Sequence, residues 1–245
     1  MYNNFCKAKI HTIHRRTLMT KYFVFLLSLL LPLSVQAKIT DEELNEVLTE
    51  HPEIVINAIQ KYQDQQKEAK DEAIKNNFKQ INKNHDNIFV GNENADIVLV
   101  EFFDFSCGYC SRLAPHIQKV IKNNPNIKVI FNPVTFVGPR SLYAAKASIA
   151  ANNQGKFLEF YTEIFSRNRK ISETDIDNVA KSIGLNMERY FTDLKSEKTT
   201  KIISNISESA QKSDVSGVPT LLLNGSVIQA YTDSEIEAAI RNAKQ

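Results

Sequence analysis

The strongest constraint on the fold is the stretch of residues 97–131, where two apolar runs enclose a helical pattern. Ile97 to Phe103 is nearly continuous in apolar residues, as expected of a strand buried on both faces. Residues 107–122 carry apolar side chains at helical spacing, and Pro115 is expected to bend that helix. Ile127 to Phe131 is a second β-rich run. Strand, helix and strand in this order predict two parallel strands joined by a right-handed crossover.

The chain beyond this unit predicts a helical block, a β-hairpin and a last helix. The hairpin is expected at residues 220–230, because Asn224-Gly225 lies between two apolar runs and Asn-Gly is a strong hairpin signal. The hairpin strands can join the first two in one mixed sheet. The sequence therefore predicts an α/β domain over residues 83–245, with a helical insertion at about 139–213.

The first 37 residues predict a secretory signal peptide. An apolar run at 22–33 follows basic residues and precedes Val35-Gln36-Ala37, which offers small residues for cleavage after Ala37. The run is too short to span a bilayer comfortably, although an uncleaved membrane anchor is the alternative. Met19 would make a more compact start to this signal than Met1.

Removal of this signal changes the net charge of the chain. The whole sequence has 30 basic and 28 acidic residues, and residues 1–37 hold five basic residues and no acidic ones. The mature chain then has 25 basic and 28 acidic residues, a net charge of −3. The sequence has no basic patch of the kind that binds nucleic acid, so we expect no nucleic-acid partner.

Residues 38–82 predict a helical arm. Thr40 and Glu43 have the spacing of a capping box, and Pro52 suits the first turn of a second helix. The second helix has an apolar stripe, but the arm has too little apolar surface for a core of its own. We expect the arm to pack on the main domain or on another copy of itself, as in a homo-oligomer.

The predicted mature chain keeps two cysteines, Cys107 and Cys110, at the junction of a buried strand and a helix. Two intervening residues at a helix start let two sulfurs reach disulfide distance. The free N–H groups and dipole of the helix N-terminus favour a thiolate at Cys107, whereas Cys110 lies inside the first turn. These positions predict Cys107 as the attacking thiol and Cys110 as the resolving thiol of a thiol–disulfide exchange.

Two other readings of the cysteine pair are weaker. A zinc site needs two more ligands, and the mature histidines, His51, His85 and His116, are scattered along the chain. A structural disulfide that closes so short a loop would constrain the unfolded chain little. A CxxC motif beside a βαβ pattern is a strong signal of redox chemistry, so we expect no metal and no cofactor.

Glu101 and Pro219 are two further candidates. Glu101 lies inside the buried run, where desolvation should raise its pKa and let it accept or relay the proton of Cys110. A position at a solvated sheet edge is the alternative for Glu101. Pro219 lies at a strand entry, where a cis bond would expose backbone to an extended substrate. From the residues alone, a trans proline is the more common case.

Several short segments of the chain match one known family. They are Val100-Glu101-Phe102-Phe103, Cys107-Gly108-Tyr109-Cys110, Arg112-Leu113-Ala114-Pro115, Gly138-Pro139 and Gly217-Val218-Pro219-Thr220. At these residues, and over roughly 88–243, the chain resembles the DsbA family of bacterial periplasmic oxidoreductases. The resemblance implies a thioredoxin-like fold with an inserted helical domain, a cis Pro219 and Glu101 as the buried acid.

The resemblance also implies what surrounds the catalytic pair. Gly108 and Tyr109 between the cysteines, and Val218 and Thr220 beside the proline, are implied to contact the substrate. Substrates would be unfolded exported proteins, and a membrane redox partner would reoxidise the cysteines. The protein would then work in the periplasm.

Two features depart from DsbA itself. Gly108-Tyr109 replaces Pro-His between the cysteines, as in the isomerase DsbC, and predicts a centre less oxidising than the DsbA value of about −120 mV. Residues 51–55 of the arm resemble a DsbA subgroup that includes oligomeric members and outer-membrane-associated immunogenic proteins. This likeness raises the prospect of outer-membrane association.

Three functions are compatible with these features. The first is a dithiol oxidase that forms disulfide bonds in exported proteins. The second is a disulfide isomerase or reductase that acts as a homo-oligomer. The third is an outer-membrane-associated structural or surface protein in which the cysteine pair is incidental, so that a Cys107→Ala chain would keep its biological role.

Overall fold

The computed structural model describes residues 40–167 and 172–244. The predicted signal peptide at 1–37 lies outside the described residues. The chain divides after Ile59 into two compact units, which are described separately here.

The predicted arm consists of two helices, α2 (Asp41–Glu50) and α3 (Pro52–Lys83). The capping box is present at the start of α2, where Thr40 Oγ1 accepts from the Glu43 amide and the Glu43 carboxylate accepts from the Thr40 amide. The helices carry exposed large apolar side chains: Leu44, Val47, Ile54, Val55, Ile56, Ile59 and Tyr62. None of these seven side chains belongs to the apolar core of the described residues.

The C-terminal part of α3 packs within the second unit. Ile74 and Ile81 are buried there, and the Asn77 side-chain amide donates to the Ser209 carbonyl (2.8 Å) and Ser213 Oγ (2.6 Å). The arm was expected to extend to residue 82 and to pack on the main domain or on another copy of itself. The last turns of α3 pack with the following domain, which is the first of these two alternatives.

A five-stranded mixed sheet forms the centre of the second unit. Its strands are β1 (Ile88–Gly91), β2 (Ile97–Phe103), β3 (Ile127–Pro133), β4 (Thr220–Leu223) and β5 (Ser226–Ile228). Their order is β1-β3-β2-β4-β5, and only the β2–β3 pair among the ladders of this sheet is parallel. The predicted βαβ unit and hairpin are both confirmed, and Asn224 and Gly225 in the hairpin turn have positive φ, as the turn requires.

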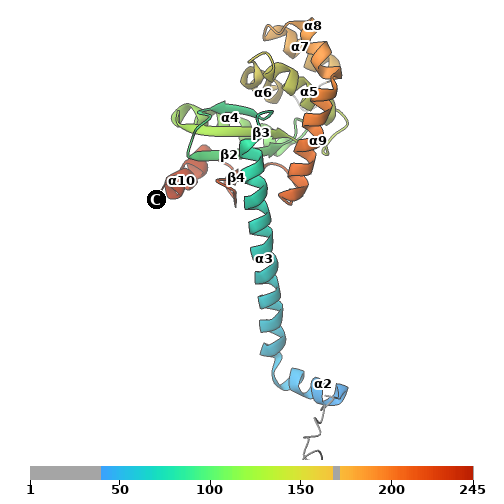
Figure 1. Cartoon of the computed structure of the whole chain (residues 1–245), viewed down its shortest axis with the longest axis vertical. Helices are drawn as coiled ribbons and strands as arrows, with labels where there is room; N and C mark the ends of the chain where they lie inside the picture. Colours follow the sequence, from blue (N-terminus) through green and yellow to red (C-terminus); the bar gives the residue numbers. More distant parts are fainter. Residues whose placement is uncertain (1–39, 168–171, 245) are drawn as a thin grey trace, which may run out of the picture. The chain divides into compact units, whose positions relative to one another are not determined.

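Seven helices of the second unit follow or interrupt the strands. They are α4 (Gly108–Asn123), α5 (Ser141–Asn152), α6 (Phe157–Ser166), α7 (Glu173–Ser182), α8 (Met187–Lys195), α9 (Glu197–Lys212) and α10 (Asp233–Ala243). Figure 1 shows α5 to α8 grouped together, with α9 running from this group back toward the sheet. Helices α5 to α9 stand between β3 and β4 in the chain, so the α/β fold with a helical insertion is confirmed.

An aromatic cluster joins the insertion to the sheet. Tyr161 of α6 meets Phe103 of β2 (ring centroids 5.3 Å apart), Phe131 of β3 (5.1 Å) and Phe165 of its own helix (4.9 Å). These edge-on pairs favour one fixed geometry beyond simple burial. Phe103 is the last residue of β2, so the cluster joins α6 to the end of the strand that leads to the cysteine pair.

Candidate active site

Cys107 occupies the N-cap position of α4, at the turn that follows β2. Its Sγ accepts a hydrogen bond from the Cys110 amide at 3.4 Å, and its own amide donates to the Asp104 carbonyl at 2.9 Å. Cys107 is 7% exposed, whereas Cys110 is 0% exposed, and both are free thiols. The helix starts one residue later than expected, and this places the Cys107 sulfur at the unpaired N–H groups of the first turn.

The loop before β4 approaches the Cys107 sulfur. The Val218–Pro219 peptide bond is cis, as the family resemblance implied. The residues alone had favoured a trans bond. The Cys107 thiol donates to the Val218 carbonyl at an Sγ–O distance of 3.3 Å. Two segments 111 positions apart in sequence therefore meet at the reactive sulfur.

Glu101 is completely buried in the middle of β2, so the prediction of burial is confirmed and the solvated sheet edge is wrong. Its cross-strand neighbours are Phe131 on β3 and Leu221 on β4, which are both apolar. Burial raises the pKa of Glu101 from 4.5 to about 8, and the hydrogen bond from Tyr161 opposes this rise. A carboxyl group with such a pKa can take up and release a proton near neutral pH.

Burial also raises the pKa of the Cys110 thiol far above its ordinary value. A backbone hydrogen bond at Asp104 opposes this rise, and negative charge on Glu101 or Cys107 adds to it. Cys110 therefore holds its proton firmly, and any reaction of its sulfur as a thiolate requires a nearby acceptor for that proton.

A groove with a volume of about 690 Å³ runs beside the cis-proline loop. Three of the four residues implied to contact substrate line this groove, namely Tyr109, Val218 and Thr220. Pro219 lines it as well. Gly108 does not line this groove. Tyr109 is 68% exposed, and the Arg112 guanidinium lies over its ring at 4.3 Å from the centroid. The groove offers both an aromatic face and a cation, and it is also lined by Val218, whose carbonyl contacts the Cys107 sulfur.

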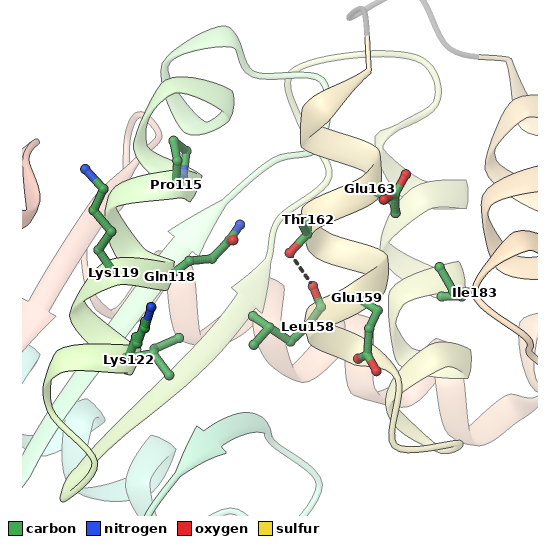
Figure 2. Close-up of a pocket in the computed structure, with 10 residues that line it drawn as sticks. Pro115, Gln118, Lys119, Lys122, Leu158, Glu159, Thr162, Glu163 and Ile183 are labelled. Atoms are coloured by element: carbon green, nitrogen blue, oxygen red, sulfur yellow. Dashed lines mark hydrogen bonds between the residues drawn. The ribbon is translucent and has the colours of Figure 1, made fainter.

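A second cavity of about 660 Å³ lies between α4 and α6 (Figure 2). Lys119 and Lys122 of α4 stand on one side of it, and Glu159 and Glu163 of α6 stand on the other. None of the candidate site residues lines this cavity, so it is separate from the groove beside the cysteines.

A family model described as thioredoxin matches residues 83–242, which is most of the chain. The chain belongs to the thioredoxin family. Every candidate site residue lies within the matched segment.

Solved structures of thioredoxin-family proteins refine this assignment. A thioredoxin-like oxidoreductase from Silicibacter pomeroyi is 27% identical, with a TM-score of 0.63, over 67% of this chain and 95% of that one. The thiol-disulfide exchange protein alpha-DsbA2 from Wolbachia pipientis is 25% identical, with a TM-score of 0.63, over 72% and 97%. The catalytic domain of Proteus mirabilis ScsC shares the fold at 21% identity and a TM-score of 0.64, over 71% and 97%. The resemblance to DsbA-like oxidoreductases is confirmed.

Curated proteins that this chain resembles in sequence are named as sodium/proton antiporters. A protein named Na(+)/H(+) antiporter NhaA 1 from Salinispora arenicola is 28% identical over 62% of this chain, and its namesake from Mycolicibacterium vanbaalenii is 32% identical over 55%. The chain spans about a quarter of the length of these relatives. The part of the chain that the structure describes includes no helix with the length and apolar character needed to cross a membrane.

Asp104 is a buried residue of this thioredoxin-family site that sequence reasoning missed. Its carboxylate accepts from the Ser106 amide (2.8 Å), Ser141 Oγ (2.6 Å) and the Val137 amide (3.0 Å). These hydrogen bonds hold the turn before Cys107 against the start of the insertion. An aspartate directly after a buried strand was the available signal, because such a side chain caps nearby amides.

Proposed function

We propose that the protein is a periplasmic thiol–disulfide oxidoreductase that forms disulfide bonds in exported proteins through Cys107 and Cys110. The observation that carries this proposal is the Cys107 sulfur at the N-cap of α4, where Cys107 is 7% exposed and Cys110 is completely buried. The relatives described as an oxidoreductase and a thiol-disulfide exchange protein support it.

The reaction starts from a Cys107–Cys110 disulfide. A substrate thiolate attacks the Cys107 sulfur, the bond to Cys110 breaks, and a mixed disulfide forms. A second substrate thiolate then attacks the substrate sulfur of that mixed disulfide and releases Cys107. The substrate loses two electrons and gains a disulfide, while both cysteines of the protein are reduced. A membrane redox partner would then reoxidise them.

Glu101 supplies the proton in this sequence. When Cys110 leaves as a thiolate behind Cys107, the buried sulfur requires a proton, since its pKa is raised by burial. The carboxyl group of Glu101, whose pKa is about 8, is protonated often enough at neutral pH to donate one. In the reverse direction, Glu101 accepts the proton as Cys110 attacks the mixed disulfide.

The substrate would lie extended along the groove next to the cis-proline loop. The backbone of Val218 lies within 3.3 Å of the Cys107 sulfur, close enough to pair with a segment bound there. The exposed ring of Tyr109 would cover an apolar side chain of the substrate.

Oxidation of reduced ribonuclease tests the proposal. We expect the wild-type chain, supplied with a glutathione buffer, to restore ribonuclease activity faster than the buffer alone. Cys107→Ala should abolish this acceleration, whereas Cys110→Ala should accumulate a mixed disulfide visible by mass spectrometry. An unchanged rate with Cys107→Ala would contradict the proposal and favour an incidental cysteine pair.

Disulfide isomerisation by a homo-oligomer is the second candidate. The exposed apolar stripe of α2 and α3, including Val47 and Ile54, favours it, because an exposed apolar surface of this kind is suited to contact with another copy of the chain. We expect light scattering to report an oligomer for the wild-type chain and a monomer for Val47→Glu/Ile54→Glu. Faster recovery of scrambled ribonuclease by the oligomer than by this variant would support isomerase activity. A monomeric wild-type chain would contradict it.

A further inference from the structure

The Tyr161 hydroxyl donates to both carboxylate oxygens of Glu101, at 3.0 Å to Oε2 and 3.2 Å to Oε1. Both side chains are completely buried. Tyr161 comes from α6 of the helical insertion, whereas Glu101 comes from the central strand β2. This hydrogen bond therefore links the insertion directly to the buried acid of the proposed reaction.

The Tyr161 ring is held in place by its neighbours. Phe103, Phe131 and Phe165 each meet it edge-on, with ring centroids between 4.9 and 5.3 Å away. A ring enclosed on several sides has no space for another rotamer. The hydroxyl is thus fixed toward Glu101 before any substrate binds.

Tyr161, Glu101 and Cys110 act on one another electrostatically. Burial raises the pKa of both Tyr161 and Cys110, and negative charge on Glu101 adds to each rise. Charge on Cys110 raises the pKa of Tyr161 further. Negative charge on Cys107, at the start of α4, would raise the pKa of Cys110 further. The neighbours of Glu101 on β3 and β4 are apolar, so Tyr161 supplies the polar contact that this carboxyl group has on the insertion side.

We propose that Tyr161 is a positioning residue that holds Glu101 in orientation and keeps it ionisable for proton exchange with Cys110. This inference rests on the proposed function. A hydroxyl donor stabilises the ionised carboxylate and so offsets part of the cost of burial. It also leaves Glu101 able to receive the Cys110 proton, since a carboxyl group has further acceptor and donor capacity beyond one bonded hydroxyl.

The competing explanation is purely structural. A buried tyrosine needs some partner for its hydroxyl, and Glu101 would then serve only to satisfy Tyr161. In that case, loss of the hydroxyl would change stability but would not change the pH dependence of the Cys110 reaction.

Stopped-flow reaction of the reduced chain with the chromogenic disulfide dithiobis(nitrobenzoic acid) separates these explanations. Cys107 attacks one reagent sulfur and releases one thionitrobenzoate. Cys110 then gives up its proton, attacks the Cys107 sulfur of the mixed disulfide and releases a second thionitrobenzoate. The first phase reports Cys107 and the second reports the proton transfer from Cys110.

For Tyr161→Phe we expect the midpoint of the second-phase pH profile to rise by about one pH unit. At pH values below the midpoints of the variant and of the wild-type chain, the second phase should then be about tenfold slower in the variant. The first phase should stay unchanged. Tyr190→Phe is the matched control, because Tyr190 is equally buried in the insertion but donates to Asp177 (2.9 Å). Its midpoint should equal that of the wild-type chain.

Glu101→Gln completes the design. We expect this variant to flatten the second-phase profile, and Tyr161→Phe in its background to add no further shift. An unshifted midpoint in Tyr161→Phe, or an equal shift in Tyr190→Phe, would overturn the role of Tyr161. Release of fewer than two thionitrobenzoates by the wild-type chain would overturn the proposed function, and this inference with it.

An infrared measurement on the wild-type chain covers the case in which Tyr161→Phe does not fold. The carbonyl stretch of protonated Glu101, assigned by its loss in Glu101→Gln, should lie at the lower frequency of a hydrogen-bonded carboxyl group. A band at the frequency of a free carboxyl group would contradict the inference.

Discussion

Glu101 links the stability of the molecule to pH. Its pKa in the folded chain is about 8, above the ordinary value of 4.5, so the folded chain binds more protons than the unfolded chain between these values. Stability therefore falls as pH rises through this window, and the favourable contribution is complete only below about pH 4.5.

Substitution of Glu101 tests this linkage. We expect Glu101→Gln to remove most of the loss of stability between pH 5 and 8, because an amide does not titrate. The free energy of unfolding of the variant should therefore rise relative to that of the wild-type chain as pH rises. Denaturant unfolding of the reduced chains at several pH values measures this difference. If the free energy of unfolding changed with pH in the same way for both chains, Glu101 would have the same pKa in the folded and unfolded states. That result would contradict the linkage.

Asp104 fixes the turn that presents Cys107. Asp104→Ala would leave the buried hydroxyl of Ser141 and the amides of Ser106 and Val137 without their acceptor, and we expect a loss of roughly 3 kcal/mol in the free energy of unfolding. Asp71→Ala is the control, because Asp71 is exposed on α3 and should change stability by less than about 0.5 kcal/mol. Equal effects of the two substitutions would contradict this account.

Among the elements, β1 depends on a glycine at its end. Gly91 has φ +103°, and a Cβ there would lie 2.0 Å from the Ile127 carbonyl oxygen of β3. We expect Gly91→Ala to lower the free energy of unfolding by about 2 to 4 kcal/mol, through backbone strain and a displaced β1–β3 pair. Thermal unfolding should show little change for Gly217→Ala, because a Cβ at Gly217 meets no atom within 4 Å.

Elements with a local signal were predictable from the sequence. The run at 97–103 is apolar on both faces and became the central strand, and Asn224-Gly225 became the hairpin turn. The helical arm was predicted to end at residue 82, close to the end of α3 at Lys83, although the mostly polar stretch within it carries no periodic apolar face. The packing of Asn77 on α9 was not predictable, since Asn77 and Ser209 lie 132 positions apart in sequence.

The candidate site was only partly predictable for the same reason. The Cys107–Cys110 pair and buried Glu101 follow from spacing and from a local apolar run. The cis form of Pro219 required the family resemblance, because a proline in a loop is more often trans. Tyr161 lies 60 positions from Glu101, so no pattern within either segment indicated that they meet.

At the scale of the whole molecule, the residues of the proposed reaction and the residues of the proposed assembly lie in different parts of the chain. Residues 60–245 contain the cysteine pair, the cis-proline loop and the groove beside them. Residues 40–59 contain no buried side chain and expose an apolar stripe. We therefore assign the proposed exchange chemistry to the second unit and the proposed assembly with other copies to the first.

The redox equilibrium of the cysteine pair with glutathione tests the central claim most directly. Alkylation of free thiols followed by mass spectrometry would measure the fraction of chain with a Cys107–Cys110 disulfide at each glutathione ratio. We predict a two-electron equilibrium within one chain, at a potential below the DsbA value of about −120 mV. A potential at or above that value would contradict the less oxidising centre expected from Gly108-Tyr109. Failure of the two sulfurs to form an intramolecular disulfide at any ratio would contradict the exchange mechanism itself.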